Sequence, residues 1–272
     1  MPCFIHPNFD PVAISFGKIT LPVLGEIALD IRWYGLMYLI GFSIAWFLGV
    51  RRSKQENSGW QKEQVSDMTF YGAMGVVIGG RIGYVLFYNF AAFLENPLSL
   101  FQVWNGGMSF HGGFIGVLAA MFLFAKKTNK GFFEIGDFIA PLVPLGLGAG
   151  RMGNFINGEL WGRATDVPWA MEFSGTTGCR HPSQLYEFAL EGLALFIILW
   201  IVSSKRPRKI VVSSLFVLLY GSFRFFVEFF RQPDNGIGFT AGWITRGQLL
   251  SSAMILAGLI MLVLALRKKQ TE

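Results

Sequence analysis

Long apolar stretches alternate with short polar segments along most of the chain. Seven of these stretches are about 20 residues long, the length at which a helix crosses the hydrocarbon core of a bilayer. They cover residues 33–50, 68–90, 110–125, 137–157, 185–203, 211–230 and 247–266. The pattern therefore predicts an all-α integral membrane protein with seven transmembrane helices, folded as a single polytopic domain over residues 1–272.

Three polar segments lie outside these stretches. Residues 1–32 lack the cationic start, apolar core and small-residue cleavage site of a signal peptide. We therefore predict a polar-to-amphipathic lead-in that lies along the membrane surface. Residues 91–109 and 158–184 each connect two apolar stretches, and residues 158–184, here called the head segment, are predicted to be the main extramembrane part.

Basic residues gather on one side of a seven-span arrangement. Most of the 23 lysines and arginines fall in clusters that follow the first, third, fifth and seventh spans. These clusters are Arg51, Arg52, Lys54 and Lys62; Lys126, Lys127 and Lys130; Lys205, Arg206, Arg208 and Lys209; and Arg267, Lys268 and Lys269. Because loops rich in Lys and Arg stay in the cytoplasm, the C-terminus is predicted to be cytoplasmic and the N-terminus outside.

Composition narrows the choice of function. Only 15% of residues are charged, against about 25% in a soluble domain, and the net charge of +6 comes from the topological clusters rather than from a nucleic-acid-binding surface. Cys3 and Cys179 show no metal-binding spacing, and we predict two unrelated thiols rather than a disulfide. Motifs for ATP, zinc-peptidase or serine-hydrolase chemistry are absent from the sequence. No metal or organic cofactor is expected.

Three arginines interrupt apolar stretches, and a buried charge in a membrane marks a candidate site because it is costly unless paired. Arg81 shares a helix face with Tyr84 and Tyr88, and its alternative role is to lock helix packing through backbone carbonyls and a carboxylate. Arg151 opens a polar run at the outer end of the fourth span. Arg224 precedes Glu228 by four residues, so the two form either a site or a self-contained ion pair.

Other polar residues fall at the same depth as Arg151 and Arg224. Asn154, Glu159 and Gly162 continue the run after Arg151, His111 lies among glycines where the third span begins, and Tyr34 stands where the first span begins. Gln184, Glu187 and Glu191 share one face of the fifth span. Two carboxylates four residues apart repel each other, so we expect an arginine from another helix to lie between them.

These residues converge in the outer half of the membrane, where arginines suit the phosphate of a phospholipid. A transporter or channel for an anionic solute would also use intramembrane arginines, but its polar residues would extend across the full thickness. A non-catalytic envelope scaffold would explain close glycine packing but not a concentration of Arg, Asn, Glu and His at one depth. A lipid-modifying enzyme is therefore the favoured interpretation.

The sequence resembles the bacterial prolipoprotein diacylglyceryl transferases in six stretches that keep their order. They are RWYGLMYLIGF, GGRIGYVLFYN, WNGGMSFHGG, GAGRMGNFINGELWGR, RHPSQLYE and FRFFVEFFRQPD. The resemblance implies a seven-span inner-membrane enzyme with a periplasmic N-terminus. It implies transfer of diacylglyceryl from phosphatidylglycerol to the lipobox cysteine of a prolipoprotein, giving a thioether and glycerol 1-phosphate. Residues implied to matter are Tyr34, His111, Arg151, Asn154, Glu159, Gly162, Arg224 and Glu228.

A mechanism for such a transfer needs a thiolate and a neutralised leaving phosphate. We expect Arg151 and Arg224 to neutralise the phosphate and Asn154 to orient the headgroup. His111 is the first candidate for the base, and Tyr34 is the second. Glu159 and Glu228 are expected to hold the arginines in place, and Arg81 is assigned to the same phosphatidylglycerol-binding cluster.

Overall fold

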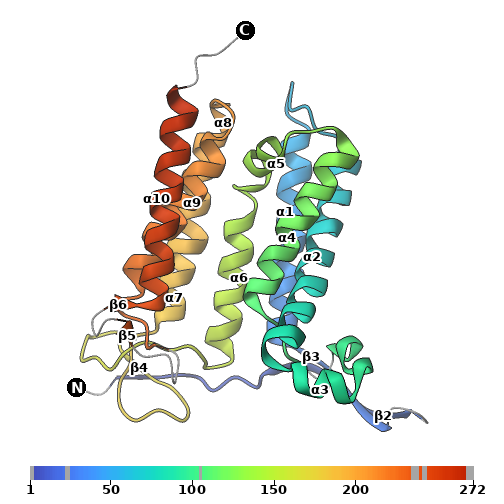
Figure 1. Cartoon of the computed structure of the whole chain (residues 1–272). Coiled ribbons are helices and arrows are strands. Elements are labelled where there is room, and N and C mark those ends of the chain that lie inside the picture. The colour runs from blue at the N-terminus through green and yellow to red at the C-terminus, as the bar shows by residue number, and fades with distance from the viewer. Residues whose placement is uncertain (1–2, 22–24, 104–105, 234–238, 241–243, 268–272) are drawn as a thin grey trace. The chain divides into compact units, whose positions relative to one another are not determined.

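The computed structural model describes residues 3–21, 25–103, 106–233, 239–240 and 244–267 (Figure 1). Contacts divide the chain into two compact units, each described here by itself. The first unit combines Met1–Ala45 with Ile139–Glu272, and the second is Trp46–Phe138. Lys268 and Lys269 of the last basic cluster, and Trp104, Asn105 and Asp234 of the family stretches, lie outside the described residues. A single domain over the whole chain stays a prediction.

The described residues are mostly helical, which confirms a multi-pass membrane protein. Five helical segments are long and apolar enough to cross a bilayer, and a sixth is added if the interrupted pair α5–α6 counts as one span. The long segments are α1 (Trp33–Ser53), α2 (Lys62–Tyr88), α4 (Phe110–Thr128), the continuous helix Ser183–Ser204 and α10 (Arg246–Arg267). The interrupted pair is α5 (Phe132–Ile139) and α6 (Val143–Ile156).

Two helical regions differ from uniform α-helical spans. The helix Ser183–Ser204 begins as α7 (Ser183–Glu187), continues as a π-helix, η3 (Phe188–Ala194), and ends as α8 (Leu195–Ser204). The sixth predicted span is α9 (Val211–Val227), which is apolar but only 17 residues long. The seventh crossing therefore stays a prediction that rests on α9.

Glycines set the closest helix contact in the second unit. A Cβ atom added to Gly75 would lie 2.6 Å from the Gly116 oxygen. A Cβ added to Gly79 would lie 2.4 Å from the Gly112 oxygen, and one added to Gly83 would lie 2.7 Å from the Gly112 Cα. Glycine at every fourth position thus lets the α2 and α4 backbones touch, as small residues do in membrane helix pairs. A short helix, α3 (Phe90–Glu95), and a 3-10 helix, η1 (Pro97–Phe101), connect these two helices.

In the first unit, α6, α7, α9 and α10 meet at one end of the helices. Figure 1 shows α9 and α10 side by side, and a Cβ at Gly258 would lie only 2.5 Å from the Leu218 nitrogen. Ala140, Leu195, Leu199 and Val212 form a buried core between α8, α9 and the start of the α6 region. At the opposite end, Arg208 donates to the Leu266 oxygen at 2.7 Å, beside the basic residues that follow α8.

Short strands precede and connect the helices. Strand β2 (Val12–Leu21) pairs antiparallel with β3 (Gly25–Arg32), so part of the predicted lead-in is a hairpin. Strand β1 (Phe4–Ile5) pairs in parallel with β4 (Met171–Glu172) of the head segment, and β5 (Phe239–Thr240) pairs with β6 (Ile244–Thr245). The β1–β4 pairing joins residues far apart in sequence, which local pattern could not reveal.

The two cysteines form a disulfide, so the prediction of unrelated thiols was wrong. Cys3 and Cys179 are 176 residues apart in sequence, and no local spacing indicates that they pair. They meet because the β1–β4 pairing carries the start of the chain to the head segment, where Arg180 bonds with Met171 of β4. The disulfide therefore fastens the N-terminal strand to the head segment.

Candidate functional site

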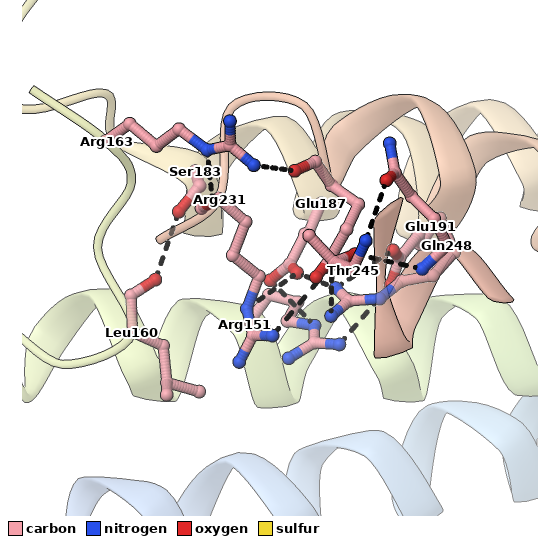
Figure 2. A network of polar contacts seen from close by, with 11 residues as sticks. Arg151, Leu160, Arg163, Ser183, Glu187, Glu191, Arg231, Thr245 and Gln248 are labelled. Atoms are coloured by element: carbon pink, nitrogen blue, oxygen red, sulfur yellow. Dashed lines mark hydrogen bonds and ion pairs between the residues drawn. The ribbon is translucent and has the colours of Figure 1, made fainter. Parts of the chain in front are cut away.

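Arginines from two helices converge on two glutamates of a third. Arg151 of α6 lies 3.1 Å from Glu187 through Nε and 3.5 Å from Glu191 through Nη2 (Figure 2). Arg224 of α9 contacts the second oxygen of Glu187 and lies 3.7 Å from the second oxygen of Glu191. The expectation that arginines from another helix separate these carboxylates is confirmed.

The cluster continues toward the end of α9. Glu228 lies 3.1 Å from Nη2 of Arg224, and Arg231 lies 3.9 Å from Glu228 and 4.0 Å from Glu187. The expected Arg224–Glu228 pair is thus confirmed, and Arg231 adds a third guanidinium that the sequence analysis did not single out. We call the six residues Arg151, Arg224, Arg231, Glu187, Glu191 and Glu228 the ion cluster.

Burial makes this pairing obligatory. The side chains of Glu187 and Glu191 are 1% and 0% exposed, whereas those of Arg151 and Arg224 are 22% and 15% exposed. Isolated ions at such positions would be strongly disfavoured, and three guanidinium groups balance three carboxylates when all are ionised. Within the described part of the chain, these contacts leave Nη1 of Arg151 without a carboxylate partner, so one donor remains for a ligand.

The start of α10 closes one side of the ion cluster. Thr245 and Gln248 form reciprocal backbone-to-side-chain hydrogen bonds, both 3.1 Å long, which cap the first turn of the helix. Figure 2 shows both capping residues near Glu191. A Cβ at Gly247 would lie 2.6 Å from the Glu228 carboxylate, so a larger residue there would have to displace this carboxylate.

A tight polar turn follows α6, next to Arg151. Asn154 donates its amide to Glu159 at 2.9 Å and accepts the Glu159 backbone N–H at 3.1 Å, while Asn157 donates to the same carboxylate at 3.2 Å. Gly158 has a φ of +66°, which favours glycine at this bend. Glu159 thus holds asparagines, and the expectation that it holds an arginine was wrong because the turn folds its carboxylate back onto Asn154.

Gly162 is packed too closely to carry a side chain. An added Cβ would lie 2.5 Å from the Phe230 oxygen and 2.7 Å from the His181 oxygen. The Gly162 N–H donates to that His181 oxygen at 2.8 Å. The imidazole of His181 is partly buried, which lowers its pKa. The glycine therefore joins the head segment to the ends of α7 and α9, whereas its predicted contact with lipid stays a prediction.

Tyr34 lies against the polar end of α6. A Cβ at Gly153 would lie 3.1 Å from the Tyr34 ring, and a Cβ at Gly41 would lie 3.0 Å from Gly146, so the start of α1 packs closely along α6. The Tyr34 ring also contacts Tyr38 with centroids 5.3 Å apart. Tyr34 is consequently close in space to Asn154, although 120 positions separate them in the printed sequence.

Arg81 belongs to the second unit and holds a loop. It donates to the carbonyls of Leu100 at 3.0 Å and Gly107 at 3.1 Å, and also to those of Ser99 and Gly106. Its guanidinium lies 5.6 Å from the Tyr84 ring, which confirms their shared helix face. The structural alternative, an arginine tied to carbonyls, fits these contacts, and its assignment to lipid binding stays an untested prediction.

His111 also belongs to the second unit. It lies in the first turn of α4, which Ser109 caps by accepting the Gly112 N–H at 3.2 Å. The His111 side chain is exposed, with its ring 5.7 Å from that of Phe110. Its approach to the ion cluster of the first unit stays a prediction.

Comparison with known proteins identifies the family. The model of the prolipoprotein diacylglyceryl transferase family matches residues 22–264. The chain belongs to this family. Among relatives named phosphatidylglycerol–prolipoprotein diacylglyceryl transferase, the protein of Aliivibrio salmonicida is 58% identical over 96% of this chain and 89% of its own. That of Pseudomonas putida is 55% identical over 98% and 97%, respectively.

In this prolipoprotein diacylglyceryl transferase, three residues near the site escaped the sequence analysis. Arg231 joins the ion cluster, and the signal available was its spacing of three from Glu228. Tyr220 precedes Arg224 by four positions, one helical turn along α9, and that spacing was the available signal. His6 contacts the end of α6 and gave no local signal, because a single histidine in a polar lead-in resembles any surface residue.

The part of the transferase that the structure describes contains no group of three or more His, Cys, Asp or Glu side chains able to hold a metal ion. The guanidinium groups of the ion cluster can neutralise negative charge, and the neighbouring amides can donate hydrogen bonds.

Proposed function

We propose that the chain transfers the diacylglyceryl group of phosphatidylglycerol to the cysteine thiol of a prolipoprotein. The sulfur attacks the glycerol carbon that carries the phosphate ester, the carbon–oxygen bond breaks, and glycerol 1-phosphate leaves with the bonding electron pair. The thiol proton passes to a base. The observation that carries the site assignment is the convergence of Arg151 and Arg224 on Glu187.

The arginines supply what the leaving group needs. Negative charge grows on the bridging oxygen as the carbon–oxygen bond breaks, and prepositioned guanidinium groups stabilise that charge. Glu187 and Glu191 hold both arginines before substrate binds, so little reorganisation is required. Arg151 and Asn154 lie three residues apart on α6, so a phosphate that accepts from Nη1 of Arg151 leaves the ion cluster intact, and Asn154, whose amide already donates to Glu159, is placed to orient the headgroup.

Proton removal is assigned to His111, with Tyr34 as the competing group. His111 lies in the first turn of α4, and its imidazole is exposed and therefore accessible to a substrate thiol. Tyr34 already packs on Gly153, one residue before Asn154. A thiol with an ordinary pKa of about 8.5 needs only partial deprotonation to become a competent nucleophile.

We infer a seven-span inner-membrane topology with the ion cluster on the periplasmic side. Cys3 and Cys179 meet in one unit, so an even number of crossings must separate them, and α1, α2, α4 and the α5–α6 pair provide four. The remaining crossings are Ser183–Ser204, α9 and α10. A disulfide belongs in an oxidising compartment, which agrees with the charge rule in placing residues 3 and 179 outside the cytoplasm.

Purified protein, phosphatidylglycerol vesicles and a peptide with a single lipobox cysteine test the proposal. Mass spectrometry should show the peptide gain one diacylglyceryl unit, with glycerol 1-phosphate released in equal amount. A matched peptide with serine at that position should stay unmodified. Transfer of an acyl chain alone, or release of free phosphate, would exclude the proposed bond cleavage.

A further inference from the structure

A histidine from the start of the chain is buried beside the proposed lipid site. His6 is only 2% exposed, and its ring stacks on Phe173 with centroids 5.0 Å apart. The Phe155 ring packs edge-on against it, also at 5.0 Å. His6 thus fills a pocket between the head segment and the end of α6, rather than lying on the membrane surface.

Hydrogen bonds to both ring nitrogens indicate the tautomer of the imidazole. The backbone N–H of Asn8 donates to Nδ1 at 3.2 Å, so this nitrogen accepts. Nε2 then carries the hydrogen and donates to the Phe155 oxygen at 2.7 Å. That carbonyl lies in the last turn of α6. The last four carbonyl oxygens of a helix have no N–H partner four residues further on within the helix. His6 therefore acts as a cap supplied from 149 residues away.

The capped turn is the one that carries Asn154 and Glu159. Phe155 also accepts the Gly158 N–H at 3.0 Å, and Glu159 closes the turn on both the backbone and the side chain of Asn154. A Cβ at Gly158 would lie 3.6 Å from the His6 ring, so the ring covers the bend directly. Displacement of His6 would release one bond of this turn and uncover its backbone.

The N-terminal strand holds His6 in place from both sides. The His6 N–H donates to the Glu172 oxygen at 2.9 Å, and the Phe4 N–H donates to the Ala170 oxygen at 2.9 Å. The Cys3–Cys179 disulfide fastens the same strand to the head segment. These contacts fix the imidazole relative to α6 independently of the membrane.

We propose that His6 is a positioning residue for the transfer reaction, acting through the Phe155 carbonyl on Asn154 and Glu159. The inference rests on the proposed function, because it assumes that Asn154 contacts the lipid headgroup. His6 itself touches no substrate. Its contribution is a fixed geometry of the turn, and small displacements of a substrate-orienting group lower turnover strongly.

Two substitutions separate packing from hydrogen bonding. His6→Phe keeps an aromatic ring in the pocket but removes the donor, whereas His6→Gln keeps an N–H donor and removes the ring. Ile5→Ala is the matched control, since Ile5 is the neighbouring residue at the end of β1 and its side chain is 75% exposed. Each variant is purified, and kcat and KM for phosphatidylglycerol are measured per folded molecule together with Tm.

We expect His6→Phe to lower kcat roughly 10- to 100-fold with little change in KM, His6→Gln to recover several-fold of that loss, and Ile5→Ala to behave as wild type. Amide exchange at Gly158 and Glu159 should accelerate in His6→Phe. Wild-type kcat in His6→Phe, or kcat in His6→Gln that is no better than in His6→Phe, would overturn the proposal. If His6→Phe does not fold, His6→Leu, which also lacks a donor, takes its place in the same comparison with His6→Gln.

Arg224→Ala is measured in the same preparation to separate this inference from the site on which it rests. Full turnover in Arg224→Ala would mean that the ion cluster is not the site. Lost turnover in Arg224→Ala with unchanged turnover in both His6 variants would overturn only the role of His6.

Discussion

Arg224 forms an ion pair with Glu187 that joins α9 to α7. The other oxygen of Glu187 faces Arg151, so one buried carboxylate aligns guanidinium groups from two helices. This arrangement gives the arginines a fixed separation before any lipid arrives. It also places their charge at the end of α7 and α9 that is opposite to Lys205 and Arg208.

Replacing Arg224 with lysine should abolish most turnover while preserving the fold. Lysine keeps the charge but cannot contact Glu187 and Glu228 through separate nitrogens, as the two Nη atoms of Arg224 do. We expect kcat to fall about 100-fold or more, the loss typical when one electrostatic stabiliser is removed. The mass-shift assay on Arg224→Lys measures this, with Arg267→Lys at the far end of α10 as control. Turnover near wild type would remove Arg224 from the site.

Glu187→Gln should damage stability as well as activity. The substitution leaves Arg151 with Glu191 as its carboxylate partner and Arg224 with Glu191 and Glu228, so three guanidinium groups face two carboxylates. Removing one partner of a buried ion pair costs about 3–5 kcal/mol. Thermal unfolding followed by intrinsic fluorescence should show a Tm several degrees lower. Glu134→Gln is the control, because Glu134 forms a partly exposed pair with Lys130. An unchanged Tm in Glu187→Gln would mean that the arginines find other partners.

Gly162→Ala should disrupt the head segment rather than only the lipid contact. The added methyl group would overlap the backbone oxygens of Phe230 and His181, neither of which can move as a flexible side chain would. Overpacking of this kind costs about 1–3 kcal/mol. Limited proteolysis of the head segment should be faster in Gly162→Ala than in wild type. The control is Ser174→Ala, in which proteolysis should be unchanged because the Ser174 side chain is exposed. Normal protease resistance with lost turnover would instead favour direct contact with lipid.

Arg81→Met should open the loop between α2 and α4. Four backbone carbonyls lose their donor, and each hydrogen bond to a charged group contributes about 1.5–3 kcal/mol. We expect faster hydrogen exchange over residues 99–107 and a lower Tm, with turnover per folded molecule within a few-fold of wild type. A collapse of turnover in well-folded Arg81→Met would return Arg81 to the substrate site.

His111→Gln should lose turnover near neutral pH and regain part of it at higher pH. If the imidazole removes the thiol proton, a variant without the imidazole must rely on hydroxide or on spontaneous ionisation of the thiol. The ordinary pKa of a thiol is about 8.5, so thiolate then forms mainly at higher pH. A pH profile of kcat/KM from pH 6 to 10 is the measurement, with Tyr34→Phe measured in parallel. Equal profiles for wild type and His111→Gln would transfer the role of base to Tyr34.

The sequence by itself determined the membrane character, the family and five of the six residues of the ion cluster. Apolar runs of about 20 residues leave few alternatives to transmembrane helices, and buried arginines need partners. The i, i+4 spacing of Glu187 and Glu191 therefore predicted correctly that arginines from elsewhere would lie between them. These are local or one-dimensional properties, which is why they could be read without a fold.

Only the tertiary structure decided which distant segments meet. It shows the disulfide between Cys3 and Cys179 and the hydrogen bond between His6 and the Phe155 carbonyl. It also shows that Asn154 donates to Glu159 and that Arg81 donates to loop carbonyls. Each of these contacts depends on how the backbone turns between helices, and the partner's residue type alone does not specify it. Periodicity reveals which face of a helix is buried, but the choice among several possible polar partners is settled only when the whole chain packs.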